Sequence, residues 1–105
     1  MAKMLLHVSA KVTKEREEAY NTWYNEEHCP KVLRLSGALS ARRYRMIMGE
    51  SEYDYLTAYE FADEETFQRF EDSEGIQELF TDYDEAFGDA SVRIRAAYVQ
   101  IWPEE

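Results

Sequence analysis

His28 is the side chain of this 105-residue chain that is best suited to move a proton. An imidazole titrates near neutral pH, so it can donate or accept a proton under physiological conditions. Glu26 and Glu27 precede it, and a nearby carboxylate would favour the charged imidazolium. The pattern predicts a catalytic His28. The alternative is a structural role, in which His28 caps the following helix or forms a hydrogen bond across a kink.

Five further side chains are candidates for binding a small molecule. His7 is a second acid or base if it looks into a cavity, although a buried histidine paired with a Tyr hydroxyl explains it equally well. Trp23 and Tyr24 belong to an aromatic helical stripe and form either a pocket wall or part of the core. Tyr55 and Tyr59 have the same parity on a predicted strand, so they share one face of it and suit an aromatic guest.

Arginine is unevenly distributed in this acidic chain. Five of the eight arginines fall on two short predicted strands: Arg42, Arg43, Arg45, Arg93 and Arg95. Arginines that face a cavity can hold a carboxylate or phenolate through forked hydrogen bonds, and we expect Arg43 to bind ligand in this way. Alternatively, the arginines pair with acidic residues across a dimer or protect edge strands from aggregation.

The composition excludes several classes of function. With 12 basic and 22 acidic residues, the formal charge of −10 argues against a nucleic-acid partner and against an anionic membrane surface. Two histidines and one cysteine do not make a zinc site. No Gly-rich phosphate loop is present, which argues against a nucleotide cofactor. We therefore expect no metal and no cofactor. Cys29 directly follows His28, and neighbours on a helix diverge by about 100°, which disfavours a nucleophile pair.

The compartment and the number of domains also follow from the composition. A single cysteine cannot form a disulfide within the chain, which favours a reducing, cytoplasmic location. No apolar run approaches the roughly 20 residues of a membrane span. The length indicates one domain over residues 1–105.

Hydrophobic periodicity predicts the elements that must position these residues. We expect strands at residues 3–11, 38–48, 53–61 and 91–102, and helices at 13–27, 30–35 and 63–87, the last interrupted at 73–75. Pro30 places a break at residues 28–29 and begins a new helix. Thr13 and Asp63 are the expected helix caps. The order β-α-β-β-α-β predicts an α+β, ferredoxin-like fold with a four-stranded antiparallel sheet and both helices on one face.

One face of such a sheet has no helix over it. We expect it to carry Leu5 and His7 from the first strand, together with Ala97, Val99 and Ile101 from the last. Exposed apolar surface of this extent is unusual on a stable monomer. Two sheets that pair face to face would cover it, which predicts a homodimer. The alternative is a monomer whose open face binds a different protein.

The segment WYNEEHCP, from Trp23 to Pro30, is followed by Val32, Leu33 and then Gly37. It resembles the W-Y-x-x-x-H-x-P-x-x-L…P-G pattern of EthD-like proteins, which are members of the dimeric α/β-barrel superfamily. The segments at 40–44 and 55–61 are also similar to that family, so the resemblance covers nearly the whole chain. It implies two ferredoxin-like sheets paired as a dimeric α/β barrel, and it maps the histidine of the motif onto His28.

This superfamily includes cofactor-independent oxygenases, lactone isomerases, polyketide cyclases and haem-degrading enzymes. The resemblance therefore implies a role in small-molecule metabolism. We expect an apolar or aromatic ligand, anionic ones included, in a barrel pocket, with cofactor-free oxygenase, isomerase or cyclase type chemistry that uses His28 as acid or base. A non-catalytic binding or assembly module with a filled barrel is the alternative, and a cavity below about 100 Å³ around His28 would favour it. Haem binding through His28 is a third hypothesis.

Overall fold

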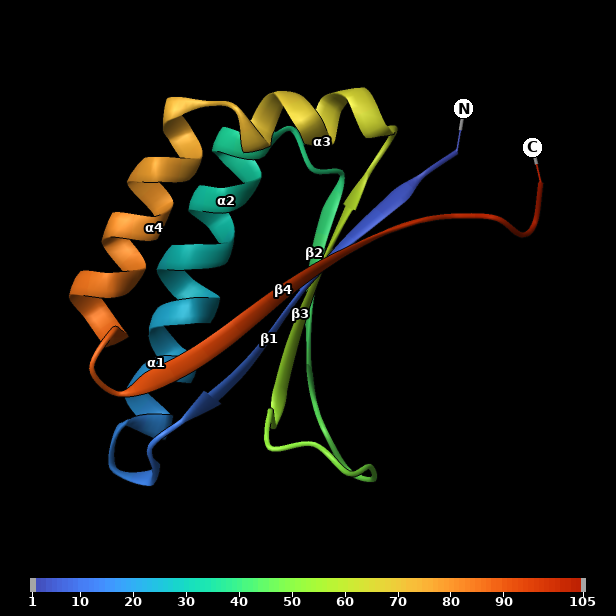
Figure 1. Cartoon of the computed structure of the whole chain (residues 1–105). Coiled ribbons are helices and arrows are strands. Elements are labelled where there is room, and N and C mark those ends of the chain that lie inside the picture. The colour runs from blue at the N-terminus through green and yellow to red at the C-terminus, as the bar shows by residue number, and fades with distance from the viewer. Residues whose placement is uncertain (1, 105) are drawn as a thin grey trace.

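A four-stranded antiparallel sheet forms the centre of the computed structural model, which describes residues 2–104. Its strands are β1 (Met4–Val12), β2 (Ser40–Arg45), β3 (Tyr55–Phe61) and β4 (Ser91–Val99), arranged in the order β2-β3-β1-β4. Figure 1 shows the sheet with all the helices on one side of it. The predicted ferredoxin-like fold is confirmed.

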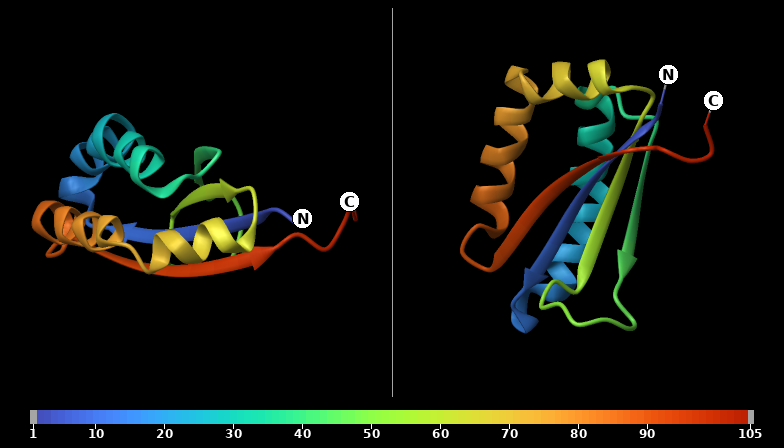
Figure 2. Two further views of the ribbon diagram at one scale, coloured as in Figure 1. Left: turned by 90° about the horizontal axis from the view of Figure 1, so that it is seen from above. Right: turned by 45° about the vertical axis from the view of Figure 1, so that its right-hand side comes forward.

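Two helical columns cover the sheet. The first consists of a 3-10 turn η1 (Lys14–Arg16), α1 (Glu17–Trp23), a π-helical turn η2 (Tyr24–His28) and α2 (Cys29–Ser36). The second consists of α3 (Glu64–Glu71) and α4 (Glu74–Phe87). The views of Figure 2 place both columns on the same face, and the opposite face is bare. None of the helices at residues 2–104 is long and apolar enough to cross a membrane.

Alternating side chains on the two inner strands build the core under these columns. On β1, the residues Met4, Leu6, Val8 and Ala10 are buried, as are Tyr55, Thr57, Tyr59 and Phe61 on β3. The helices contribute mainly aromatic and large aliphatic side chains to the same cluster: Tyr20, Tyr24, Phe70, Ile76, Leu79, Tyr83 and Phe87. The predicted inward parity of β1 is confirmed.

The helix break predicted at residues 28–29 is wrong. The chain stays helical from Glu17 to Ser36 and passes through a π turn, in which the Cys29 N–H donates to the carbonyl of Tyr24. Pro30 has no N–H to donate to the carbonyl four residues earlier. The wide turn directly before Pro30 changes the hydrogen-bond spacing there, and this is how a helix continues past such a site.

Of the two predicted helix caps, Asp63 is confirmed and Thr13 is not. The Asp63 carboxylate accepts from the Thr66 N–H at 2.7 Å and begins α3. Ser73 interrupts the second column and caps α4 by accepting from the Ile76 N–H at 3.3 Å. Thr13 stands at the N-terminus of η1, but its side chain makes no capping hydrogen bond. The strands of the hairpin are also shorter than predicted, because residues 46–54 form a loop.

The prediction for the bare face of β4 is wrong by one residue. β4 pairs with β1 so that Tyr98 lies opposite Leu5 and Ala96 lies opposite His7. Residues directly opposite one another share a face of the sheet. The bare face therefore carries Val92, Ile94, Ala96 and Tyr98, whereas Ala97 and Val99 face the helices and Ile101 lies beyond the strand.

The helix-side positions of β4 explain this difference. Arg93 and Arg95 occupy them, and the pattern alone favours placing charged residues away from the helices. In the structure, the guanidinium groups of Arg93 and Arg95 each lie 5.3 Å from the ring centre of Phe80 on α4. Arg95 also forms an ion pair with Glu71 at 2.6 Å. Aromatic rings and one carboxylate make these positions suitable for arginine.

Candidate functional site

His28 lies at the end of the π turn, where the first column faces α4. Its side chain is only 5% exposed and is surrounded by aromatic rings. The Trp23 ring stacks on it at 4.8 Å, and Tyr24 meets it edge-on at 4.8 Å. Tyr83 of α4 lies 6.0 Å away. The predicted candidates His28, Trp23 and Tyr24 therefore form one cluster.

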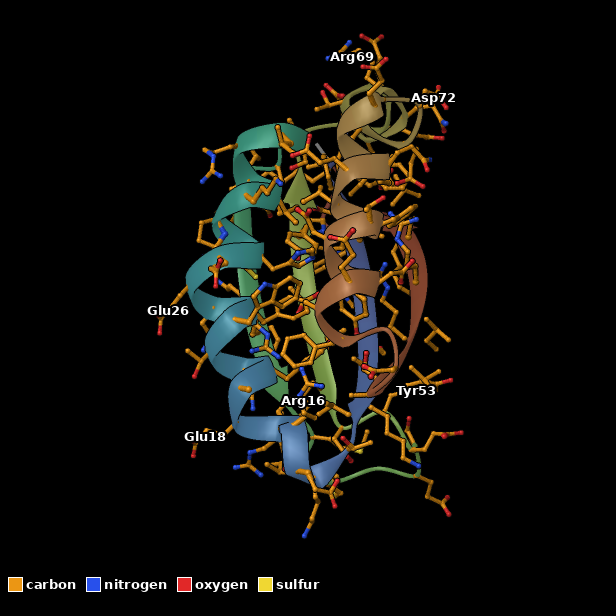
Figure 3. The ribbon with its side chains drawn as sticks, turned by 90° about the vertical axis from the view of Figure 1, so that its left-hand side faces the viewer. Arg16, Glu18, Glu26, Tyr53, Arg69 and Asp72 are labelled. Atoms are coloured by element: carbon orange, nitrogen blue, oxygen red, sulfur yellow. The ribbon has the colours of Figure 1, made fainter. Side chains whose placement is uncertain are left out.

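The environment of His28 favours the neutral imidazole. Burial, followed by the positive charge of Arg93, lowers the pKa of His28 to about 4, and the negative charge of Asp82 acts in the opposite direction. The expected imidazolium is wrong, because its two neighbouring glutamates are exposed, and Figure 3 shows Glu26 pointing outward from the helix.

The polar atoms of His28 are not used in capping. His28 stands at the start of α2 without a side-chain capping bond. Its Nδ1 atom is buried and has no hydrogen-bond partner in the structure. Buried polar groups in proteins are nearly always paired, so an unpaired one calls for an explanation. The structural role proposed for His28 as a helix cap is not seen.

An outer groove runs between the first column and α4, with His28 in its wall. Its volume is about 630 Å³, within the range of small-molecule sites. Figure 3 looks onto this side of the molecule, where the two columns lie side by side in front of the sheet. The lining combines apolar and charged residues: Trp23, Pro30 and Ala86, with Glu26, Glu27, Lys31, Arg34, Asp82 and Glu85.

Lys31 links the two sides of this groove. Its ammonium group forms ion pairs with Glu78 at 2.5 Å and with Asp82 at 2.6 Å. These contacts join α2 to α4 and raise the pKa of Lys31. The groove contains more acidic than basic side chains, so its rim favours a neutral ligand over an anionic one.

An inner pocket lies on the other side of His28, between the helices and the sheet. Its volume is about 30 Å³, which is room for a single water molecule. Its polar and aromatic lining includes Tyr24, His28, Tyr59, Phe80, Arg93 and Arg95. The barrel pocket expected from the sequence is therefore nearly filled by side chains.

The Cys29 thiol and the Tyr59 hydroxyl meet beside this pocket at 3.8 Å. Burial raises the pKa of Cys29, and burial also holds the pKa of Tyr59 well above its usual range. Both groups are therefore protonated at neutral pH. A thiol needs its thiolate form to act as a nucleophile, which agrees with the expectation that Cys29 does not.

Arg43 and Tyr55 belong to a separate polar cluster and line neither hollow. The Arg43 guanidinium stacks 4.3 Å from the Tyr24 ring centre and donates to the side-chain oxygen of Asn25 at 2.9 Å. The Tyr55 hydroxyl donates to Glu17. These contacts hold β2 and β3 against the first column.

His7 lies on the opposite, bare face of the sheet. It packs 5.1 Å from the Tyr98 ring and lines a shallow hollow of about 330 Å³ with Leu5, Arg42 and Tyr44. The sheet separates it from His28, so the two histidines cannot act on the same ligand.

The sequence predicts no site role for the α4 residues Phe80, Asp82 and Tyr83. Phe80 and Tyr83 lie at helical spacing on the inner side of α4, and this spacing brings Phe80 to the inner pocket and Tyr83 to His28. Among residues 2–104, no three His, Cys, Asp or Glu side chains are grouped closely enough to hold a metal ion.

The element order and sheet topology define a ferredoxin-like α+β protein. A family model described as a domain of unknown function, DUF4286, matches residues 3–101. The chain therefore belongs to this family. No curated protein matches it.

Solved structures with this fold cover nearly the whole chain. An EthD family protein from Bacillus halodurans is 17% identical, with a TM-score of 0.65 over 91% of this chain and 97% of that one. A DABB family protein with a ferredoxin-like fold from Mesorhizobium loti is 14% identical, with a TM-score of 0.70 over 91% and 96%. SnoaB, a cofactor-independent oxygenase from Streptomyces nogalater, is 15% identical, with a TM-score of 0.64 over 97% and 98%. The predicted resemblance to EthD-like proteins is confirmed.

Proposed function

We propose that the chain binds an apolar or aromatic small molecule against His28, which lines both the outer groove and the inner pocket, and uses His28 as the proton acceptor of a cofactor-free reaction. The observation that carries this proposal is the unpaired, buried Nδ1 atom of His28 in the wall of a groove of about 630 Å³. A neutral imidazole can accept a proton at pH 7, whereas an imidazolium cannot. The Trp23 ring stacked on His28 offers a flat apolar surface to a ligand.

The class of chemistry is that of an oxygenase, isomerase or cyclase acting without a metal or nucleotide. Each of these reactions can begin with removal of a proton from an acidic C–H or O–H group. One structure of the same fold is a cofactor-independent oxygenase by its printed description. This likeness, at 15% identity, supports our proposal of the same class of reaction for this chain.

A titration with neutral aromatic and polyketide-like compounds tests this function. Trp23 lies in the groove wall, so its fluorescence should change on binding, and a Trp102→Phe background removes the exposed second tryptophan. We expect saturable binding to the parent protein. For a compound that the parent converts, turnover should be at least tenfold lower in His28→Gln. Glu18→Gln, at an exposed position of α1, is the matched control and should behave as the parent. Unchanged turnover in His28→Gln would make His28 structural.

A non-catalytic binding or assembly module is the second candidate function. The inner pocket of about 30 Å³ favours it, because ligand sites usually reach several hundred Å³. As an assembly module with a filled barrel, the chain would show no saturable binding in the same titration and no ligand density at His28 in soaked crystals.

We also propose that two copies of the chain pair through the bare face of the sheet. Val92, Ile94 and Tyr98 on that face are 50–59% exposed, and an exposed apolar patch of this kind is typical of an interface. Both signs of charge are present there, from Lys11, Arg42 and Glu60. A two-fold pair can match these charges to one another. The dimeric barrel remains a prediction.

A further inference from the structure

Arg93 is the charged group of the inner pocket that has no partner. No hydrogen bond or ion pair joins its guanidinium to another residue between 2 and 104. Its Cζ atom lies 3.7 Å from the centre of the Tyr83 ring and 5.3 Å from that of Phe80. Arg95, beside it, donates two hydrogen bonds to Glu71 at 3.0 and 2.6 Å. Arg93 is therefore positioned by aromatic rings while its donors remain free.

The second unpaired group of the pocket is His28. Only 5% of its surface is exposed, and its Nδ1 atom has no hydrogen-bond partner. The two residues line the same pocket of about 30 Å³. A space of this size admits one oxygen atom with its hydrogen, as a water molecule would occupy it. The aromatic body of a ligand must remain outside this space.

We propose that this inner pocket is an oxyanion site, in which Arg93 binds the deprotonated oxygen of a weakly acidic phenol or enol and His28 accepts its proton. The inference rests on the proposed role of His28 as proton acceptor and deepens it. In this step the O–H bond of the ligand breaks, an N–H bond forms at His28, and the electron pair stays on the oxygen. No oxidant or reductant takes part.

The charged groups around His28 support this coupling. They are Arg93 of β4, Arg43 of β2, Lys31 of α2 and Asp82 of α4. The rings of Tyr83 of α4 and Tyr24 of η2 pack against His28, and Glu26 and Glu27 beside it on the helix are exposed. The cations outnumber the one nearby carboxylate, so protonation of His28 alone is disfavoured. An oxyanion beside Arg93 adds the missing negative charge, which makes the protonated imidazole stable.

4-Nitrophenol is a suitable probe, because its phenolate form absorbs visible light and its neutral form does not. The experiment is carried out below the pKa of the free probe, where the neutral phenol dominates. We expect the wild-type protein to produce a saturable phenolate band. Arg93→Gln should weaken this binding at least tenfold. Arg45→Gln, which makes the same change of charge at an exposed position of β2, should leave the band unchanged.

A third variant separates the two proposals. His28→Gln should lose the band at this pH but still bind the phenolate at higher pH, because Arg93 remains. A wild-type protein that binds only neutral phenol, or a full band in Arg93→Gln, would contradict the oxyanion site and leave the proposed function standing. A full band in His28→Gln would contradict both proposals, as would the absence of any binding. Circular dichroism of each variant checks that the fold is retained.

Discussion

At the scale of single residues, burial rather than sequence neighbourhood sets the chemistry of His28. Two glutamates precede it, yet they lie in solvent, while the imidazole is enclosed by the rings of Trp23, Tyr24 and Tyr83. Desolvation disfavours the charged form of a histidine. The result is a base that stays neutral and unpaired at physiological pH, at the cost of a buried polar atom without a partner.

The lowered pKa of His28 predicts how stability depends on pH. The pKa is 6.5 in the unfolded chain and about 4 in the folded one, so the unfolded state binds more protons between these values. Stability therefore falls as the pH is lowered from 6.5 to 4, and this group contributes about 3 kcal/mol to the change. Urea unfolding at several pH values measures it.

His28→Gln is the reference for this measurement, because it removes the titrating group and retains the carboxylates that also titrate in acid. The difference in unfolding free energy between wild type and variant should shift by about 3 kcal/mol from pH 7 to pH 4. Parallel pH profiles for the two proteins would contradict a buried, neutral His28.

Part of this site could be predicted from the sequence. The motif identifies His28, and helical spacing places Trp23 and Tyr24 on one aromatic stripe. The stacking of Trp23 on His28, five residues apart, depends on the π turn. The contact between Arg93 and Tyr83 could not be predicted in the same way. It depends on which face of β4 the arginine occupies, and that is set by a register with β1 that the local pattern does not contain.

At the scale of elements, the π turn before Pro30 decides where His28 points. It joins α1 and α2 without a break, so Trp23 and His28 remain on one continuous helix and can stack. A local rule about proline predicts a break. The rule fails here because a helix can change its hydrogen-bond spacing next to a proline instead of ending.

Two glycines, one after α2 and one in α4, should respond to alanine in opposite directions. Gly37 has φ +78 and a Cβ there would lie 3.2 Å from the Thr66 methyl group. Gly37→Ala should therefore destabilise the protein by about 1–2 kcal/mol. Gly75 lies inside α4, where an added Cβ makes ordinary 3.5 Å contacts, so Gly75→Ala should stabilise it by about 0.5–1 kcal/mol. Thermal unfolding measures both, and a shared sign would contradict these backbone assignments.

At the scale of the whole molecule, the helices leave one face of the sheet open to solvent (Figure 2). The order of elements predicts this face, because both helices of a ferredoxin-like fold lie on the same side. Its composition on β4 was predicted from the wrong parity, and the corrected face is still apolar, with Val92, Ile94 and Tyr98 in place of Ala97 and Val99. A dimer is therefore expected for either parity of β4.

A charge placed on this face should separate the copies. Ile94→Lys combined with Tyr98→Lys puts two cations into the proposed interface, where like charges of the two copies would meet. We expect sedimentation at micromolar concentration to give twice the subunit mass for the wild type and a single subunit for this variant. Ile47→Lys, in the exposed loop between β2 and β3, is the control and should remain dimeric. A wild-type protein that sediments as a monomer would contradict the pairing.

The ring resonances of His28 test the central claim most directly. A pH titration followed by NMR reports whether the imidazole is neutral or charged, and comparison with His28→Gln assigns its signals. We expect a neutral ring at pH 6, with protonation only as the pH approaches 4. A ring that is already half protonated near pH 6.5 would show that solvent reaches it, and would contradict a buried proton acceptor.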